Sequence, residues 1–494
     1  MADMKDTIEL SRLPAAAPPQ SADDHGSIAS LSTSKGVFNS PTVDARELDT
    51  TLSRNGTGAN SEGLSLPPVD RGRGAWTFVL CATLLEAFIW GFGICFSVIL
   101  VHLETHEPWS NASLAALSSI GTIQLGLMFF LTFFVNNAFR RYPEKAKLAI
   151  YISAATYPLS LLLSSFATQV WQLILLQGIL GGISGAILYG PVLLWSVSWF
   201  HAKRGLASGI IFSGTGFGGA VFPFLLGRLL DKYGFAWTCR IWAIICAVVF
   251  GLTTYFIRPR IPPTKPAKGQ RRPKWFIISP KVLNHPINWT LSITTLLASL
   301  AYFPVSLYLP LYTQSLLYPS TNSFTPNLVV AVFNLVAFVS STAIGWASDK
   351  SLSATATFVG VAGAAVALGA WGTATDLTRI FFFAAIFGAT TPISSYWGAA
   401  SREIGGSDPF IAGFLLCQWG MIRGLASIVA PFISTGLYDE KAAHSNSDSW
   451  GRFGFQSMII FVGVMSFVSS FGGIVLGFLK MRSNSDKRKG VAAA

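Results

Sequence analysis

Long apolar stretches alternate with short polar connections along most of the chain, from Trp76 to Lys480. Twelve of these stretches are long enough to cross a hydrocarbon core, which takes about 20 helical residues. They lie at about 76–101, 113–138, 148–167, 170–200, 205–230, 236–257, 287–313, 327–347, 354–374, 380–400, 410–436 and 453–480. Apolar runs of this length without period-two alternation exclude a β-barrel. The pattern therefore predicts an all-α membrane protein with twelve transmembrane helices in two six-helix halves.

The segments outside these stretches predict the remaining organisation of the chain. Residues 1–70 are rich in Ser, Pro and Asp and contain no Trp or Tyr, so we expect a disordered N-terminal tail without a cleaved signal peptide. We expect a first half at 71–257, a Pro-containing basic linker at 258–286, a second half at 287–480 and a C-terminal tail at 481–494.

The distribution of Lys and Arg predicts the orientation of the helices. The chain has 51% hydrophobic and 12% charged residues, with 35 Lys and Arg against 23 Asp and Glu. Most basic residues fall in the linker, the C-terminal tail and the other connections of one side, while the opposite connections carry few, among them Lys232, Arg379 and Lys441. Connections rich in Lys and Arg stay in the cytoplasm, so both termini are predicted to be cytoplasmic. The membrane is expected to be the cell membrane. The net charge of +12 then reports topology and not a nucleic-acid partner.

The sequence offers little chemistry for catalysis, cofactors or metals. All five cysteines fall within predicted spans and none forms a CxxC pair, which argues against disulfides and against a metal site. No P-loop, HExxH or GxSxG sequence is present, so we expect a protein that is not an enzyme. A membrane sensor that transports nothing is an alternative from another functional class, although the predicted tails are short for signalling.

Two charged residues lie near the centre of predicted spans. Glu86 follows Trp76 by ten residues, which places it about 15 Å into the first span, and Arg423 lies near the middle of the eleventh. Charges at this depth generally face a cavity or a partner. We expect Glu86 to serve as a protonation site and Arg423 to anchor a substrate carboxylate or other acceptor oxygens. A guanidinium suits a carboxylate because it makes two parallel hydrogen bonds to one. A mutual ion pair, or an arginine bonded to carbonyl groups, explains the same residues equally well.

Further polar residues within the spans are candidates for binding or packing. Gln124, Tyr189, Asn334 and Gln418 each offer a hydrogen bond to a substrate, although contacts between helices explain each of them singly. The glycines of the fifth span, namely Gly205, Gly209, Gly214 and Gly218, form pairs four residues apart that let helices approach closely. They fit a sliding interface in a transporter, and static packing explains their spacing as well.

An internal repeat supports a duplicated architecture. Pro223, Phe224, Leu229 and Asp231 recur 208 residues later, in the equivalent span of the second half, as Pro431, Phe432, Leu437 and Asp439. The sequence Gly345-x-x-x-Asp349-Lys350 resembles the short inner-loop motif of the major facilitator superfamily. The 6 + 6 layout and the long middle linker are similar to that superfamily too.

Three sequence stretches resemble the monocarboxylate porter family within that superfamily. They are Asp70–Trp76, Trp109–Ser110 with Ser119–Gln124, and Gln177–Gly178 through Pro191 to Trp199–Gly209 with Ser213–Gly214 and Gly218–Gly219. Arg402–Gly405 is similar to a loop of fungal members. The chain departs from the proton-coupled members, which carry a lysine in the first span and an Asp/Arg pair in the eighth.

The resemblance implies a secondary transporter that moves a small organic molecule by alternating access. Fungal members of the family export secondary metabolites or import larger organic molecules, and we expect export here. Proton-coupled uptake of a monocarboxylate is the alternative. The expected partners are a small organic substrate, with or without a carboxylate, together with protons and the lipid bilayer. We expect no nucleic-acid partner, and we expect a monomer. The sequon at Asn111 is a glycosylation candidate on the outer side.

Overall fold

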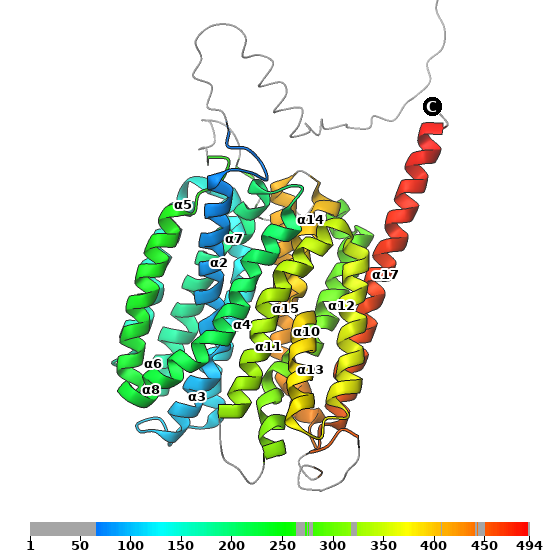
Figure 1. Cartoon of the computed structure of the whole chain (residues 1–494). Helices are drawn as coiled ribbons and strands as arrows, with labels where there is room; N and C mark the ends of the chain where they lie inside the picture. The colour runs from blue at the N-terminus through cyan, green and yellow to red at the C-terminus, as the bar shows by residue number, and fades with distance from the viewer. Residues whose placement is uncertain are drawn as a thin grey trace, which may run out of the picture. The chain divides into compact units, whose positions relative to one another are not determined.

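The computed structural model describes residues 66–262, 272–273, 275, 280–317, 324–406, 408–439, 442 and 450–492. Most of the predicted N-terminal tail, about half of the predicted linker and the end of the C-terminal tail lie outside these residues. Figure 1 shows the described part as a bundle of helices that lie side by side.

The helices that precede the linker are here called the N-half. They are α2 (Arg73–Ile94), α3 (Phe96–Thr105), α4 (Leu114–Arg141), α5 (Pro143–Ser164), α6 (Val170–Leu173), the π-helical segment η1 (Ile174–Leu180), α7 (Gly181–Trp199) and α8 (Arg204–Phe256).

The helices that follow α8 are here called the C-half, and the first of them, at 280–283, lies within the linker predicted at 258–286. They are α9 (Pro280–Leu283), α10 (Pro286–Leu317), α11 (Phe324–Lys350), α12 (Leu352–Val366), the π-helical segment η2 (Ala367–Trp371), α13 (Leu377–Thr390), the 3-10 turn η3 (Ile393–Tyr396), α14 (Trp397–Gly405), α15 (Pro409–Leu437) and α17 (Gln456–Ala492).

Several helices begin where a polar side chain satisfies free backbone amides. Ser351 caps α12 through the amide of Ala354, and Asp376 caps α13 through the amide of Arg379. Asp408 caps α15, whose first residue is proline. Such caps replace bonds that the first turn of a helix lacks, and they define where each span begins.

Eleven helices within the described residues are long and apolar enough to cross a membrane. One of them, α8, has 53 residues and would be about 80 Å long as a straight helix, far more than one crossing needs. Its backbone leaves helical geometry at Gly234, which has φ 71°. We therefore interpret α8 as two consecutive crossings, which corresponds to the spans predicted at 205–230 and 236–257.

The two halves meet mainly along two pairs of helices, with smaller contacts of α7 with α15 and of α8 with η3 and α14. In the N-half, α8 packs against α2 and α5, and in the C-half, α17 packs against α10 and α12. Across the halves, α8 contacts α11 and α4 contacts α15. Figure 1 shows α2 to α8 grouped on the left and α10 to α17 on the right.

Candidate functional site

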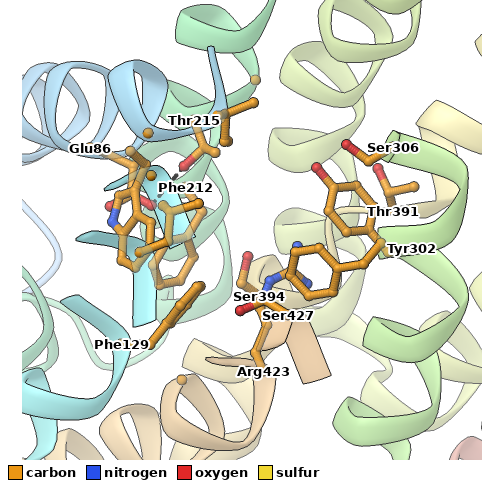
Figure 2. Close-up of a pocket in the computed structure, with 18 of the residues that line it drawn as sticks. Glu86, Phe129, Phe212, Thr215, Tyr302, Ser306, Thr391, Ser394, Arg423 and Ser427 are labelled. Carbon is orange, nitrogen blue, oxygen red and sulfur yellow. Dashed lines mark hydrogen bonds between the residues drawn. The ribbon is translucent and has the colours of Figure 1, made fainter. Parts of the chain in front are cut away.

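A cavity of about 330 Å³ lies between the two halves. Its lining comes from both, with α2, α3, α4, α7 and α8 on one side and α10, α11, η3, α14 and α15 on the other. The lining is mostly apolar and aromatic, and it contains Glu86 and Arg423 (Figure 2). These are the carboxylate and the basic group among its described lining residues.

Glu86 is held on the N-half wall of the cavity. It lies on α2 with 3% of its surface exposed. Its Oε1 accepts a hydrogen bond of 2.8 Å from the hydroxyl of Thr215 on α8, which Figure 2 marks with a dashed line. Its second oxygen, Oε2, is buried without a hydrogen-bond partner. Burial of a polar atom without a partner is costly, so Oε2 is placed to accept a hydrogen bond or a proton.

Arg423 lies on the opposite wall and is held by aromatic rings. Its guanidinium carbon is 4.9 Å from the centroid of Tyr302 and 5.6 Å from that of Phe303, both on α10. Within the described part of the chain the guanidinium makes no hydrogen bond or salt bridge, and its buried Nη1 has no partner. Cation–π contacts leave the N–H groups at the guanidinium edge unused. Arg423 is thus placed to donate hydrogen bonds to a ligand.

The structure brings Glu86 and Arg423 to one cavity without pairing them. No salt bridge joins them in the described residues, although each contributes to the other's electrostatic environment. Tyr189 on α7 also lines the cavity and interacts electrostatically with both. In this conformation the two charges face the cavity separately.

The other predicted lining residues divide into two groups. Tyr189 and Asn334 line the cavity, and Asn334 Nδ2 also donates to the carbonyls of Gly219 and Val330. Gln124 and Gln418 are absent from its lining. Gln124 donates instead to the hydroxyl of Tyr157 at 3.2 Å.

Gln418 belongs to a contact between α10 and α15. It accepts from Asn288 at 3.5 Å and donates to Ser292 at 3.4 Å. The structure thus places Gln124 and Gln418 in contacts between helices, which is the alternative to substrate binding given for them above. The predicted sequon residue Asn111 is exposed between α3 and α4, and its glycosylation stays a prediction.

The sequence reasoning does not predict the hydroxyl groups of the lining, among them those of Thr215, Ser306 and Ser394. Thr215 holds Glu86, while Ser306 and Ser394 line the C-half wall of the cavity. Their positions carry no signal in the sequence, because a single hydroxyl is common in an apolar helix and usually bonds to its own backbone.

Asp349 joins the two halves at the end of the bundle where α8 begins. Its carboxylate accepts hydrogen bonds from the backbone amides of Gly205 and Leu206, both at 2.8 Å. Arg402 on α14 lies 3.7 Å from the same carboxylate and donates to the carbonyls of His201 and Ala202. Charge-assisted bonds to the first amides of a helix are favourable, so this network closes the cavity at that end.

A second carboxylate holds the same connection from the N-half. Asp70, which precedes α2, accepts hydrogen bonds from the amides of His201, Ala202 and Lys203 at 2.9 to 3.0 Å. The connection from His201 to Leu206, here called the gate loop, is therefore held by carboxylates from both halves.

The glycines of α8 let it approach two partners. A Cβ on Gly205 would lie 2.5 Å from the carbonyl oxygen of Gly345, and one on Gly209 would lie 2.6 Å from that of Ser341, both on α11. A Cβ on Gly218 would instead lie 2.8 Å from the carbonyl oxygen of Ala87 on α2, and Gly214 also faces α2. Gly205 and Gly209 thus pack across the halves, while Gly214 and Gly218 pack within the N-half.

Comparison with known proteins finds a family match and several similar transporters. A family model of the Major Facilitator Superfamily matches residues 78–431. The chain is 27% identical over 434 residues to the aspyridones efflux protein apdF of Emericella nidulans, which covers 86% of this chain and 82% of that protein. It is 27% identical over 287 residues to the MFS-type transporter pytF of Aspergillus terreus, covering 57% and 92% of the two chains.

A third relative matches a shorter region. An MFS-type transporter of Gibberella zeae is 33% identical over 201 residues, which are 40% of this chain and 44% of that protein. The family match covers the cavity residues from Glu86 to Arg423 and the carboxylate of Asp349. The chain belongs to the Major Facilitator Superfamily and is a multi-pass membrane transporter of small organic molecules.

Proposed function

We propose that this protein exports a fungal-type secondary metabolite across the cell membrane by alternating access. The observation that carries the proposal is the cavity between the halves, which holds Glu86 and Arg423 while the Asp349 network closes one end. A site between two repeats, closed on one side, is what alternating access requires. The name of the Emericella nidulans relative, an efflux protein, favours export over uptake.

The direction in which the cavity extends fits a state that opens to the outside. Its lining reaches Leu100 near the end of α3, whereas in α8 it stops at Phe212, about two turns beyond Arg204. We propose that both termini are cytoplasmic, which places the gate loop on the cytoplasmic side. We also place the chain with the monocarboxylate porter family, on the motifs of its first half.

For the driving force we propose proton exchange at Glu86. This carboxylate lies in the wall of the cavity, and Thr215 holds one of its oxygens. A proton that enters from the outside would reach it through the same cavity that releases the substrate.

Metabolite profiles of cells with and without the protein test the export proposal. We expect the cargo to accumulate inside cells that lack the protein and to return to the medium when the wild-type chain is restored. The matched control restores the Arg423→Ala variant at equal surface level, and this variant should leave the cargo inside. Greater depletion of a compound from the medium by wild-type cells would indicate uptake instead. Identical profiles in all cells would contradict transport and favour a sensor.

A further inference from the structure

The C-half wall of the cavity collects polar groups without intramolecular partners. Besides the guanidinium of Arg423, the half-buried hydroxyls of Ser306 and Ser394 make no hydrogen bond to the described residues. Three groups from α10, η3 and α15 are thus free to bind on one wall. Two of them, the hydroxyls, can donate or accept, while the guanidinium can only donate.

The N-half wall presents mainly flat aromatic and aliphatic surface. Trp90 and Phe129 lie with their ring centroids 4.3 Å apart, and Phe212 lines the cavity beside them. The carboxylate of Glu86 is almost fully buried in this wall and is engaged by Thr215. Figure 2 shows Glu86, Phe212 and Thr215 on the left of the cavity and Tyr302 and Ser306 on the right.

This division of the walls selects the chemistry of the cargo. A desolvated guanidinium gains most from an anionic acceptor, and hydroxyls on the same wall can bind further oxygens of the cargo. Aromatic walls favour a planar apolar body, which stacks on rings or contacts their edges. The volume of about 330 Å³ lies at the small end of ligand sites.

Building on the export function proposed above, we propose that the cargo is an amphipathic organic acid. Its acidic head, a carboxylate or an enolate, binds Arg423 with Ser306 and Ser394, and its planar apolar body lies against Trp90, Phe129 and Phe212. The cargo then touches both halves at once, with its polar end on one and its apolar end on the other.

Binding of a matched pair of probes to the purified full-length protein in lipid nanodiscs tests this proposal. The probes are naphthalene-2-carboxylate and the neutral naphthalene-2-carboxamide, with naphthalen-2-ylmethylammonium as a cation, each titrated by calorimetry at pH 7. We expect the carboxylate to bind about tenfold more tightly than the carboxamide, because one charge-assisted contact is gained, and the ammonium to bind most weakly. Arg423→Gln should equalise the carboxylate and carboxamide affinities, and Ser394→Ala should weaken the carboxylate alone by a few-fold.

Two controls separate the outcomes. Arg379→Gln removes an exposed arginine that pairs with Asp376, and it should leave all affinities unchanged. Phe129→Ala should weaken all the probes alike, and thermal unfolding of each variant checks its folding. The proposal is overturned by equal or tighter binding of the carboxamide or ammonium, by a persistent acid preference in a folded Arg423→Gln variant, or by absence of probe binding. If one of these results is found while cells still export a cargo, the organic-acid proposal fails and the export proposal stands. If the protein binds acids selectively but cells export nothing, the export proposal fails and the acid preference of the cavity stands.

Discussion

The carboxylate of Asp349, near the end of α11, accepts a hydrogen bond of 2.8 Å from the backbone amide of Gly205, in the first turn of α8. The two residues belong to different halves, so this bond exists only while the halves are closed at this end. A second bond to the amide of Leu206 strengthens it. Substitutions at Asp349 should therefore change the balance between the two access states more than they change the fold.

Asp349→Ala should shift the protein towards opening at the gate loop. Loss of two charge-assisted bonds costs about 1.5–3 kcal/mol each in comparable cases, which is enough to change a two-state ratio at least about tenfold. Labelling of Ser394→Cys by a membrane-impermeant maleimide, in inside-out vesicles of a chain without its other cysteines, measures the opening. We expect faster labelling in the Asp349→Ala background and no change with Asp376→Ala, which removes a helix cap elsewhere. Equal labelling in both backgrounds would contradict the role of Asp349.

Gly209→Ala should block the close approach of α8 to α11. The new Cβ would lie 2.6 Å from the backbone oxygen of Ser341, and backbone atoms cannot move aside as a flexible side chain does. We expect a loss of stability of about 1–3 kcal/mol and a strong loss of transport. Thermal unfolding and cargo export measure the two effects. Gly251→Ala, at a position of the same helix where no neighbour lies within 4 Å, should have little effect.

Thr215→Val should weaken transport by releasing Glu86. Hydrogen bonds to charged groups contribute about 1.5–3 kcal/mol, so we expect a loss of about tenfold or more in transport rate at normal surface level. Thr215→Ser keeps the hydroxyl and should restore most of the activity. Normal transport by the Val variant together with a loss in the Ser variant would indicate a packing role for the methyl group instead.

Glu86→Gln should remove the response of transport to a pH gradient. The amide keeps the shape of the side chain but cannot exchange a proton, so the coupled step fails while exchange of cargo for cargo continues. Proteoliposomes with an imposed pH gradient distinguish the two modes. Glu403→Gln is the control, because Glu403 pairs with Lys480 at 2.9 Å away from the cavity. An unchanged response of Glu86→Gln to the gradient would exclude this residue as the coupling site.

Much of the fold could be predicted from hydrophobic length alone, since backbone groups in a bilayer must be satisfied within helices. The break at Gly234 illustrates the limit of such a prediction. The polar residues near it separate two apolar spans in the sequence, and the structure shows a break in helical geometry there, with φ 71° at Gly234. The sequence predicts the connection between the two spans, but it does not predict the residue at which the backbone leaves helical geometry.

Residues of the site could be predicted where placing the side chain in a membrane has a high free-energy cost. Glu86 and Arg423 stand out because a charge within an apolar span needs a cavity or a partner. Gln124 and Gln418 show what such reasoning lacks. A helix that is apolar on all sides carries no pattern that fixes its rotation, so the sequence does not say which amide faces the cavity. Ser306 and Ser394 are missed for the opposite reason, since hydroxyls are inexpensive anywhere in a helix.

The way in which the gate loop is held determines which residues can occupy it. Both carboxylates that hold it bind backbone amides, and the side chains of His201, Ala202 and Lys203 are exposed. Recognition of this kind does not depend on which side chains stand at these positions, so they can diverge without opening the gate. Proline is the exception, because it has no amide hydrogen to donate. Residues His201 to Lys203 are thus constrained by one forbidden residue and not by any required one, whereas Gly205, in the same loop, is required by its close approach to α11.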